Sequence, residues 1–357
     1  MIAFLSSLTF RNLAAKLGSL PTPERTDEWP EPQFQLLREA DGWKWNIPQE
    51  CGGIGMDTRD LLEVYRELAG FSLVTTFILT QRNAACSRIE LSGNTDLRRE
   101  LLTGLCRGEL FATVGISHLT TSRQHLQTPA VTVQRLPAVG GYLMTGHVPW
   151  ATGANQADIL VTGGTLSNGT QLLAAVPLKR DGVTVLPPVG LLGLSASQTG
   201  AVSLQDVFVA DDEVLHGPMV KVMSQGAAGG AGSLGTSALA IGAAQGTLRQ
   251  CTEEARHRPE LHEFLSPLQA EAAKLAMQLR QAATDVDVGT LAVEMLRRRA
   301  NLLVTRAAQV WLAATRGAGY VSGHPAERAV RESMFFLVWS CPQPVLAANL
   351  RDLTCEK

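Results

Sequence analysis

The stretch GYLMTGHVPWATGANQADILVTG, residues 141–163, decides the fold class of this chain. Two apolar runs, 142–145 and 159–162, flank a segment rich in Gly, Asn and Asp, which predicts two strands joined by a turn. A Trp-x-Thr step, Trp150 and Thr152, follows the first run. Taken alone, this pattern is equally typical of a hairpin with a buried tryptophan, so the flanking sequence has to decide what it is.

Strand patterns of five to eight residues continue on both sides of this stretch, from about residue 110 to 215. They include 111–116, 172–177, 183–186 and 201–209, separated by Gly, Pro, Asn and Asp turns. Even spacing without intervening helices predicts an antiparallel β-barrel or sandwich.

Helical patterns fill the rest of the chain. Apolar residues at helical spacing run from Asp57 to about Gly70, and another helix begins at Asp96. Beyond Met219, sequence rich in Ala and Leu predicts helices over 228–257, 266–283, 286–316 and 325–340. We therefore expect an N-terminal α-helical domain (1–110), a middle β-domain (111–217) and a C-terminal four-helix bundle (218–357).

Composition narrows the possible functions. The chain has 357 residues, a net charge of -2 and 18% charged residues, so no basic surface for nucleic acid is expected. No apolar run approaches the length of a membrane span. The six cysteines form no CxxC pair or metal-binding spacing, which predicts a reduced, intracellular protein without a metal site.

The first 23 residues carry Arg11 and Lys16 but no acid. Two interpretations are open, an amphipathic first helix or a mitochondrial transit peptide, and we favour the helix. A cytoplasmic location follows from the first interpretation and the mitochondrial matrix from the second.

A glycine motif, residues 230–235, matches the GxGxxG dinucleotide fingerprint. Its surroundings exclude that function, because no clear strand precedes it and a helix of some twenty residues follows. We interpret it as a Gly-rich start of a helix at a domain junction.

Several segments in order along the chain resemble the flavin-dependent acyl-CoA dehydrogenase family. Residues 46–57 are similar to IPEEYGGxG, 141–152 to GYxLxGxKxWIT, 192–209 to LGxRGSxTxxVxFEDVxV, and 317–332 to GGxGYxxxxPxERxxRD. The resemblance implies that family's helix, β-domain and helical-bundle architecture. It also implies FAD as cofactor, a homodimer or homotetramer, an acyl-CoA or other small-molecule substrate, and an electron-transfer partner.

The same resemblance assigns flavin contacts by position. Trp150 and Thr152 take the WIT positions, where an indole covers the flavin ring and a hydroxyl bonds its N5 or O4, and Ser117 takes the Thr position of TEPxxGSD. Arg258 takes the Arg position of RxxFG, where it binds the FAD pyrophosphate of a neighbouring subunit. The backbone at Gly317 and Gly319 would approach the same FAD.

The chain departs from the family pattern where catalysis takes place. The family's catalytic Glu lies nine residues after the Arg that is Arg331 here, which is Ser340, or in a minority of members at the position of Gly235. Neither residue can abstract a proton from an acyl-CoA. His118 replaces the Glu of TEPxxGSD and is a candidate base or a ligand of pyrophosphate or a backbone carbonyl, and Cys341 is either a thiolate base or a small buried residue.

Three functions fit these residues. The first is an FAD-dependent acyl-CoA dehydrogenase-like oxidoreductase, acting on CH–CH groups, with its base at an unusual position. The second is a flavin-dependent monooxygenase of the same fold. The third is a non-catalytic relative that binds flavin or acyl-CoA. We take the first as the leading hypothesis.

Overall fold

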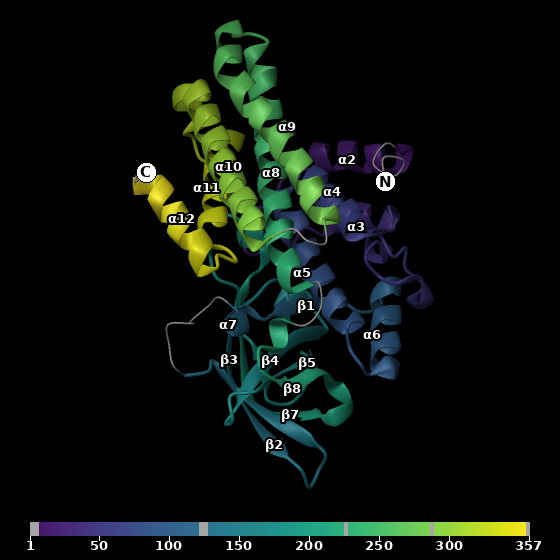
Figure 1. Cartoon of the computed structure of the whole chain (residues 1–357). Helices are drawn as coiled ribbons and strands as arrows, with labels where there is room; N and C mark the ends of the chain where they lie inside the picture. Colours follow the sequence, from purple (N-terminus) through teal and green to yellow (C-terminus); the bar gives the residue numbers. More distant parts are fainter. Residues whose placement is uncertain (1–6, 121–127, 225–227, 286–288, 355–357) are drawn as a thin grey trace.

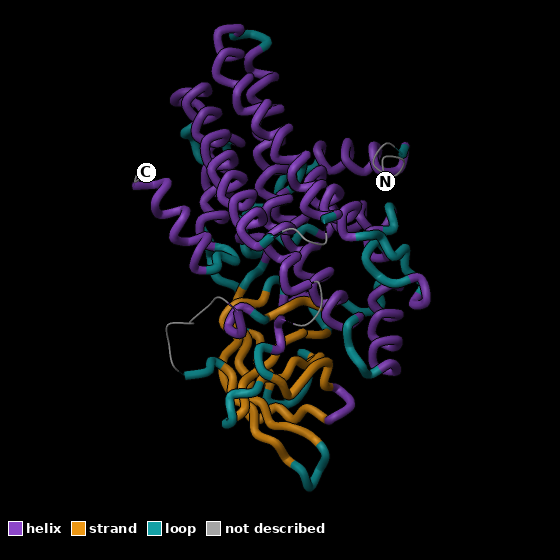
Figure 2. The backbone as a smooth tube through the Cα atoms, in the orientation of Figure 1, coloured by secondary structure: helices purple, strands orange, loops and turns teal. Residues whose placement is uncertain are grey.

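A computed structural model describes residues 7–120, 128–224, 228–285 and 289–354 of this chain. It has helices before and after a single mixed sheet, as Figures 1 and 2 show. The N-terminal helices are α2 Leu8–Ser19, α3 Glu31–Glu39, α4 Thr58–Ala69, α5 Leu73–Glu90 and α6 Thr95–Arg107. The C-terminal helices are α8 Ala228–Ala255, α9 His262–Thr284, α10 Thr290–Gly319, α11 Pro325–Val338 and α12 Gln343–Thr354. The predicted architecture is confirmed, with α12 as an additional helix.

The sheet contains eight strands in the order β6-β7-β3-β2-β4-β5-β8, with β1 paired to β4. Its strands are β1 Ala112–Gly115, β2 Val131–Leu136, β3 Gly141–Ala151, β4 Ile159–Leu166, β5 Gln171–Pro177, β6 Val183–Val185, β7 Gly200–Ala210 and β8 Val214–Met219. Most pairs are antiparallel, but β4 pairs in parallel with both β1 and β2. The expectation of an entirely antiparallel sheet therefore needs correction. All four residues of β1 are buried, as parallel strands covered on both faces usually are.

The N-terminal helices and the C-terminal bundle share one hydrophobic core. It joins residues as distant in sequence as Phe10, Leu37, Phe77, Ile241 and Phe336. A second core lies between α5, α6 and the sheet, and a third lies within the sheet. Helix α5 contacts β1, α4, α6 and α8, which explains why it is apolar on nearly all sides.

Two sequence interpretations about the helices can be compared with the structure. Residues 8–19 form the amphipathic helix α2, which buries Phe10, Leu13 and Leu17. The GxGxxG match lies in the first turns of α8, in agreement with its rejection as a dinucleotide motif. Among the described residues, no helix is long and apolar enough to cross a bilayer.

Helices α4 and α8 approach each other at glycines. A Cβ on Gly242 would lie 2.0 Å from the Arg66 carbonyl oxygen, and one on Gly246 would lie 2.3 Å from the Gly70 carbonyl oxygen. On the same helix, a Cβ on Gly235 would meet no atom within 4 Å. Side chains at 242 and 246 would push the two helices apart, whereas one at 235 would not.

We therefore expect Gly242→Ala to lower the free energy of unfolding by about 1–3 kcal/mol, because the added methyl meets backbone that cannot move aside. The matched substitution Gly235→Ala should be neutral or stabilising by up to about 1 kcal/mol, because alanine favours the helix. Urea unfolding followed by circular dichroism measures both. Equal losses of unfolding free energy in the two variants would contradict the close approach of α4 and α8 at Gly242.

Candidate functional site

Four residues predicted for the site meet at the edge of the sheet that faces the bundle. Ser117 and His118 begin the short helix α7 Ser117–Thr120 directly after β1, while Trp150 and Thr152 lie at the end of β3. Strand β1 lies against this part of β3, because the Thr113 hydroxyl donates to the Thr152 carbonyl oxygen at 2.7 Å. Figure 1 shows α7 between the sheet and the lower ends of the bundle helices.

Ser117 and His118 have buried polar atoms without partners. His118 Nε2 lies 2.9 Å from the Gly163 carbonyl oxygen, so the ring donates a proton there. Burial lowers the pKa of His118, which favours the neutral ring with a lone pair on Nδ1. Within the described ranges, neither His118 Nδ1 nor Ser117 Oγ has a hydrogen-bond partner. Such orphaned atoms are rare in native proteins and fit a site for a polar ligand. Residues 121–123 of the predicted loop lie outside the described part.

Trp150 and Thr152 differ in their exposure to solvent. The Trp150 side chain is 39% exposed, whereas Thr152 is 1% exposed. The Thr152 hydroxyl lies 3.0 Å from Thr199 Oγ1, which in turn lies 2.8 Å from Ser197 Oγ. Trp150 therefore offers a free ring face at the predicted flavin position. Thr152 already has a partner inside the protein, and its contact with a flavin stays a prediction.

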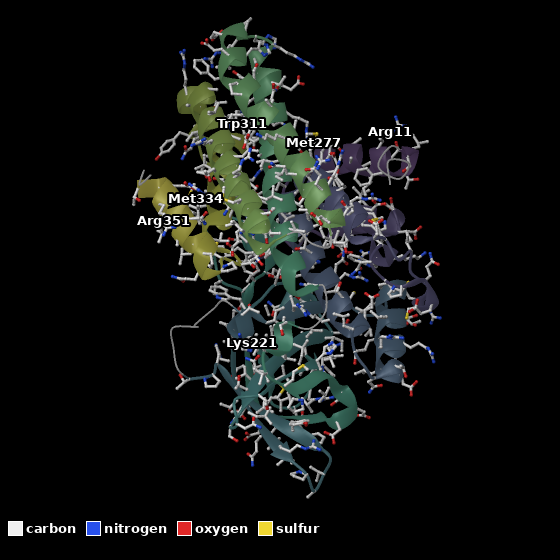
Figure 3. All side chains as sticks on the ribbon, viewed as in Figure 1. Arg11, Lys221, Met277, Trp311, Met334 and Arg351 are labelled. Carbon is white, nitrogen blue, oxygen red and sulfur yellow. The ribbon has the colours of Figure 1, made fainter. Side chains whose placement is uncertain are left out.

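Arg258, Gly317 and Gly319 lie together at the opposite end of the bundle. Arg258 Nη1 donates to the Ala314 carbonyl oxygen, and Nε donates to Glu260 at 3.2 Å. A Cβ on Gly317 would meet no atom within 4 Å, so this backbone is open, while one on Gly319 would collide with the Thr315 side chain. Figure 3 labels Trp311 in the upper part of the bundle and Lys221 beside the sheet, which marks how far apart the two ends are.

Both positions at which the family carries its base lack a carboxylate. Ser340 is exposed in the turn after α11 and has a φ of 45°, in the left-handed region. Gly235 faces open space from α8. The thiol of Cys341 lies 3.4 Å from the Leu337 carbonyl oxygen, and burial raises its pKa, so it acts as a protonated helix-end donor. The structure places Cys341 as a half-buried residue at the end of α11, and a role as thiolate base is not favoured.

Arg297 is the buried residue near Ser340 that sequence reasoning missed. It is 1% exposed, and burial lowers its pKa to about 10. Its guanidinium donates to Asn301 Oδ1 at 2.9 Å and to the Trp339 carbonyl oxygen at 3.0 Å. No carboxylate pairs with it in the described part of the chain.

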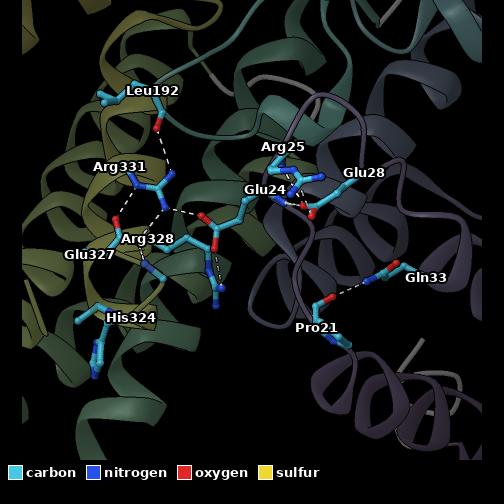
Figure 4. A network of polar contacts seen from close by, with 12 residues as sticks. Pro21, Glu24, Arg25, Glu28, Gln33, Leu192, His324, Glu327, Arg328 and Arg331 are labelled. Carbon is cyan, nitrogen blue, oxygen red and sulfur yellow. Dashed lines mark hydrogen bonds and ion pairs between the residues drawn. The ribbon is translucent and has the colours of Figure 1, made fainter. Parts of the chain in front are cut away.

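The motif Glu327–Glu332 joins three parts of the chain, as Figure 4 shows. Arg331 bonds Glu24, Glu327 and the Leu192 carbonyl oxygen, and Arg328 pairs with Glu24 at 3.2 Å. The ion pairs with Glu24 connect α11 to the segment before α3, and the hydrogen bond to Leu192 connects it to the loop before β7.

Two cavities lie away from the Ser117–Trp150 corner. One is lined by Gly93, Asn94, Tyr142, Asp211 and residues 214–217. The other lies at the tip of the bundle and is lined by residues that include His257, Trp311, Thr315 and His324. Neither contains a residue predicted for the site. In the described ranges, no group of three or more His, Cys, Asp or Glu is placed to hold a metal ion.

Comparisons with known proteins agree with this fold. The N-terminal domain model of acyl-CoA dehydrogenase matches residues 11–109. The fold of the whole chain matches a glutaryl-coenzyme A dehydrogenase with a TM-score of 0.80, 19% identity, and coverage of 98% of this chain and 96% of that one. These comparisons support an acyl-CoA dehydrogenase-family member. The predicted family is thereby confirmed.

Relatives within the acyl-CoA dehydrogenase family have different activities. A probable acyl-CoA dehydrogenase of Bacillus subtilis is 24% identical over 341 residues, covering 87% of this chain and 86% of the relative. A dibenzothiophene monooxygenase of Mycolicibacterium goodii is 28% identical over 304 residues, covering 76% of this chain and 70% of the relative. For the Rhodococcus erythropolis enzyme the identity is 25%, and the match spans 48% of its length. An FMN-bound structure of the Paenibacillus sp. A11-2 enzyme has a TM-score of 0.77, 17% identity, and coverage of 97% and 96%.

Glu332 provides a test of the electrostatics of α11. Its carboxylate is partly exposed and makes no hydrogen bond or ion pair among the residues described, and burial raises its pKa from 4.5 to about 7. The folded state therefore binds more protons than the unfolded state between these values, and stability falls as pH rises from about 4.5 to about 7. We expect Glu332→Gln to be more stable than the wild type above pH 7, on the order of 1–3 kcal/mol, with the difference vanishing below about pH 4.5.

Glu327 is the matched control, because its ion pair with Arg331 holds its pKa below the ordinary value. Glu327→Gln should destabilise the protein at neutral pH, and the loss should disappear as the pH falls through the lowered pKa. Thermal unfolding at several pH values measures both variants. The same pH trend in both variants would refute the assignment of a raised pKa to Glu332 and a lowered pKa to Glu327.

Proposed function

We propose that this chain is a flavin-dependent oxidoreductase that works without a carboxylate base at either position used by the dehydrogenases of its family, and that it acts as a monooxygenase. The proposal rests on the two positions at which the family carries its catalytic Glu, because this chain has Ser340 at one and Gly235 at the other. Removal of an α-proton from a thioester requires a base of suitable pKa, and a serine without an activating partner is far too weak. Oxygen insertion does not need that base. The similarity to dibenzothiophene monooxygenases supports the same choice.

The residues at the edge of the sheet fit a flavin. Trp150 offers an exposed indole face, and Ser117 Oγ and His118 Nδ1 are buried polar atoms without partners in the described part of the molecule. A bound flavin would supply the redox chemistry, taking a hydride when oxidised and reacting with oxygen when reduced. We infer FAD, because Arg258 and the open backbone at Gly317 suit the pyrophosphate of a dinucleotide.

The two groups of predicted flavin contacts lie at opposite ends of the bundle, so one FAD would need both from different copies of the chain. We therefore infer a homodimer or homotetramer in which Arg258 and Gly317 of one copy complete the site at Trp150 of another. The exposed indole would cover one face of the ring, and Ser117 would bond its polar edge. We propose an electron-transfer partner only for the case in which the chain acts as a dehydrogenase.

His118 would hold and release protons in this site. Its Nε2–H is already donated to Gly163, so a proton can be accepted at Nδ1 without loss of that bond. Burial lowers the pKa of His118, which keeps the ring neutral with its Nδ1 lone pair free and makes it a weaker base than an exposed histidine. The substrate is a small molecule whose identity the chain does not specify.

An acyl-CoA dehydrogenase-like oxidoreductase remains a second candidate, because the same lone pair on His118 Nδ1 would be its base. The two functions differ in which state of the flavin meets the substrate. A dehydrogenase reduces its flavin with acyl-CoA in the absence of oxygen, and a monooxygenase does not.

We predict that the purified protein, reconstituted with FAD, keeps its visible flavin spectrum during anaerobic titration with acyl-CoAs of varied chain length. After reduction of the flavin by an added reductase and NAD(P)H, oxygen uptake should be coupled to a hydroxylated product. Bleaching by an acyl-CoA would favour the dehydrogenase instead. A protein that takes up neither FAD nor FMN would favour a non-catalytic relative.

Trp150→Ala should weaken flavin binding about tenfold, because the lost ring contact is worth roughly 0.5–1.5 kcal/mol beyond the area it covers. The control is Phe208→Ala on β7, which removes a ring of similar exposure, 38% against 39%, at the opposite end of the β3–β7 ladder. Fluorescence titration with FAD measures both. Equal affinities for the wild type and Trp150→Ala would refute the assignment of Trp150.

A further inference from the structure

The segment between α2 and α3, residues 21–29, crosses from the bundle to the end of β3 without forming a helix or strand. We name it the strap. Its own hydrogen bonds make it compact, because the Glu28 carboxylate accepts from the backbone N–H groups of Glu24 at 2.9 Å and Arg25 at 3.1 Å. Figure 4 shows these bonds beside the arginines of α11. A segment held in shape in this way can move as a unit about its ends.

Besides the packing of Trp29 on Phe34 and Phe111 and the bond from Gln33 to the Pro21 carbonyl oxygen, three contacts fasten the strap. Glu24 pairs with Arg328 and Arg331 of α11. The Thr26 carbonyl oxygen accepts from Gln198 Nε2 at 3.0 Å. The Trp29 ring packs on Gly153, where a Cβ would come within 2.8 Å of the ring and where φ is +64°. Each point belongs to a different part of the chain, namely α11, the loop before β7, and the turn after β3.

The strap crosses the turn that carries the predicted flavin contacts. Gly153 directly follows Thr152, and Gln198 lies between Ser197 and Thr199, whose hydroxyls form the buried chain that ends at Thr152. Trp150 is 39% exposed but Thr152, two residues later, is 1% exposed. The Trp29 ring of the strap thus lies on Gly153, the residue after Thr152, while Trp150 stays exposed.

We propose that the strap is a gate over the flavin-facing turn Trp150–Gly153, and that the ion pairs of Glu24 with Arg328 and Arg331 are its latch. This inference rests on the proposed flavin site. With the latch released, the strap swings away from Gly153, and the Thr152 hydroxyl becomes accessible to the ring. The latch can open at small cost, because Glu24 and both arginines are partly exposed and Arg331 keeps Glu327 as a partner.

The experiment compares the full-length wild type with Glu24→Gln, which removes the latch charge, and with Asp27→Asn as matched control. The substitution Asp27→Asn removes the same charge from the same strap, but the Asp27 side chain is 66% exposed and pairs with Arg25. Hydrogen exchange of peptides covering 21–29 reports opening of the strap, and stopped-flow mixing with FAD and with FMN reports the rate of flavin association. Arg328→Gln tests the latch from its other side and serves if Glu24→Gln does not fold.

Glu24→Gln should speed both exchange of the strap and flavin association by about three- to tenfold, as expected for loss of partly exposed ion pairs, with Arg328→Gln smaller in the same direction. Asp27→Asn should leave both rates unchanged. Faster exchange with unchanged flavin association would overturn the gate while leaving the proposed flavin site intact. If no variant binds FAD or FMN, the proposed function fails, and the gate fails with it.

Discussion

The close contact of α4 with α8 is the constraint on which the rest of the structure depends. Gly242 and Gly246 allow two backbones to touch, and this contact fuses the N-terminal helices and the bundle into one core. Helix α5 is then held on the sheet from behind, so that β1 can be buried as a parallel strand. The corner formed by Ser117, His118 and Trp150 exists because β1 and β3 are fixed relative to each other beneath the bundle.

Much of the fold could be predicted from sequence, because the periodicity of apolar residues changes once near residue 110 and again near 219. The positions of Ser117, His118 and Trp150 at strand ends could be predicted because they lie within recognisable segments, and their contact with a flavin stays a prediction. The parallel pairing of β1 with β4 was not predicted, since a four-residue strand carries no signal of its direction. The strap was missed because its fastening joins Glu24 to Arg328, 304 residues further along the chain.

The turn after α11, which carries Ser340, is held by polar contacts without a carboxylate. Arg297 fixes the Trp339 carbonyl from inside the bundle, and the Cys341 thiol bonds the end of the helix. Burying a cation without a carboxylate is costly, so the polar groups of Asn301 and the turn have to replace water around it. The backbone of this turn is therefore held by hydrogen bonds from Arg297 and Cys341 and not by a carboxylate.

This fixed turn also limits which side chains can work as a base at position 340. Ser340 has a left-handed backbone, in which any side chain with a Cβ is strained, and the neighbouring carbonyl is bound to Arg297. A glutamate at position 340 would stand on that strained backbone, beside a buried positive charge that lowers its basicity. A carboxylate introduced at this position alone would therefore be a weak base, and a variant designed to carry an effective base there needs changes at Arg297 and in the turn as well.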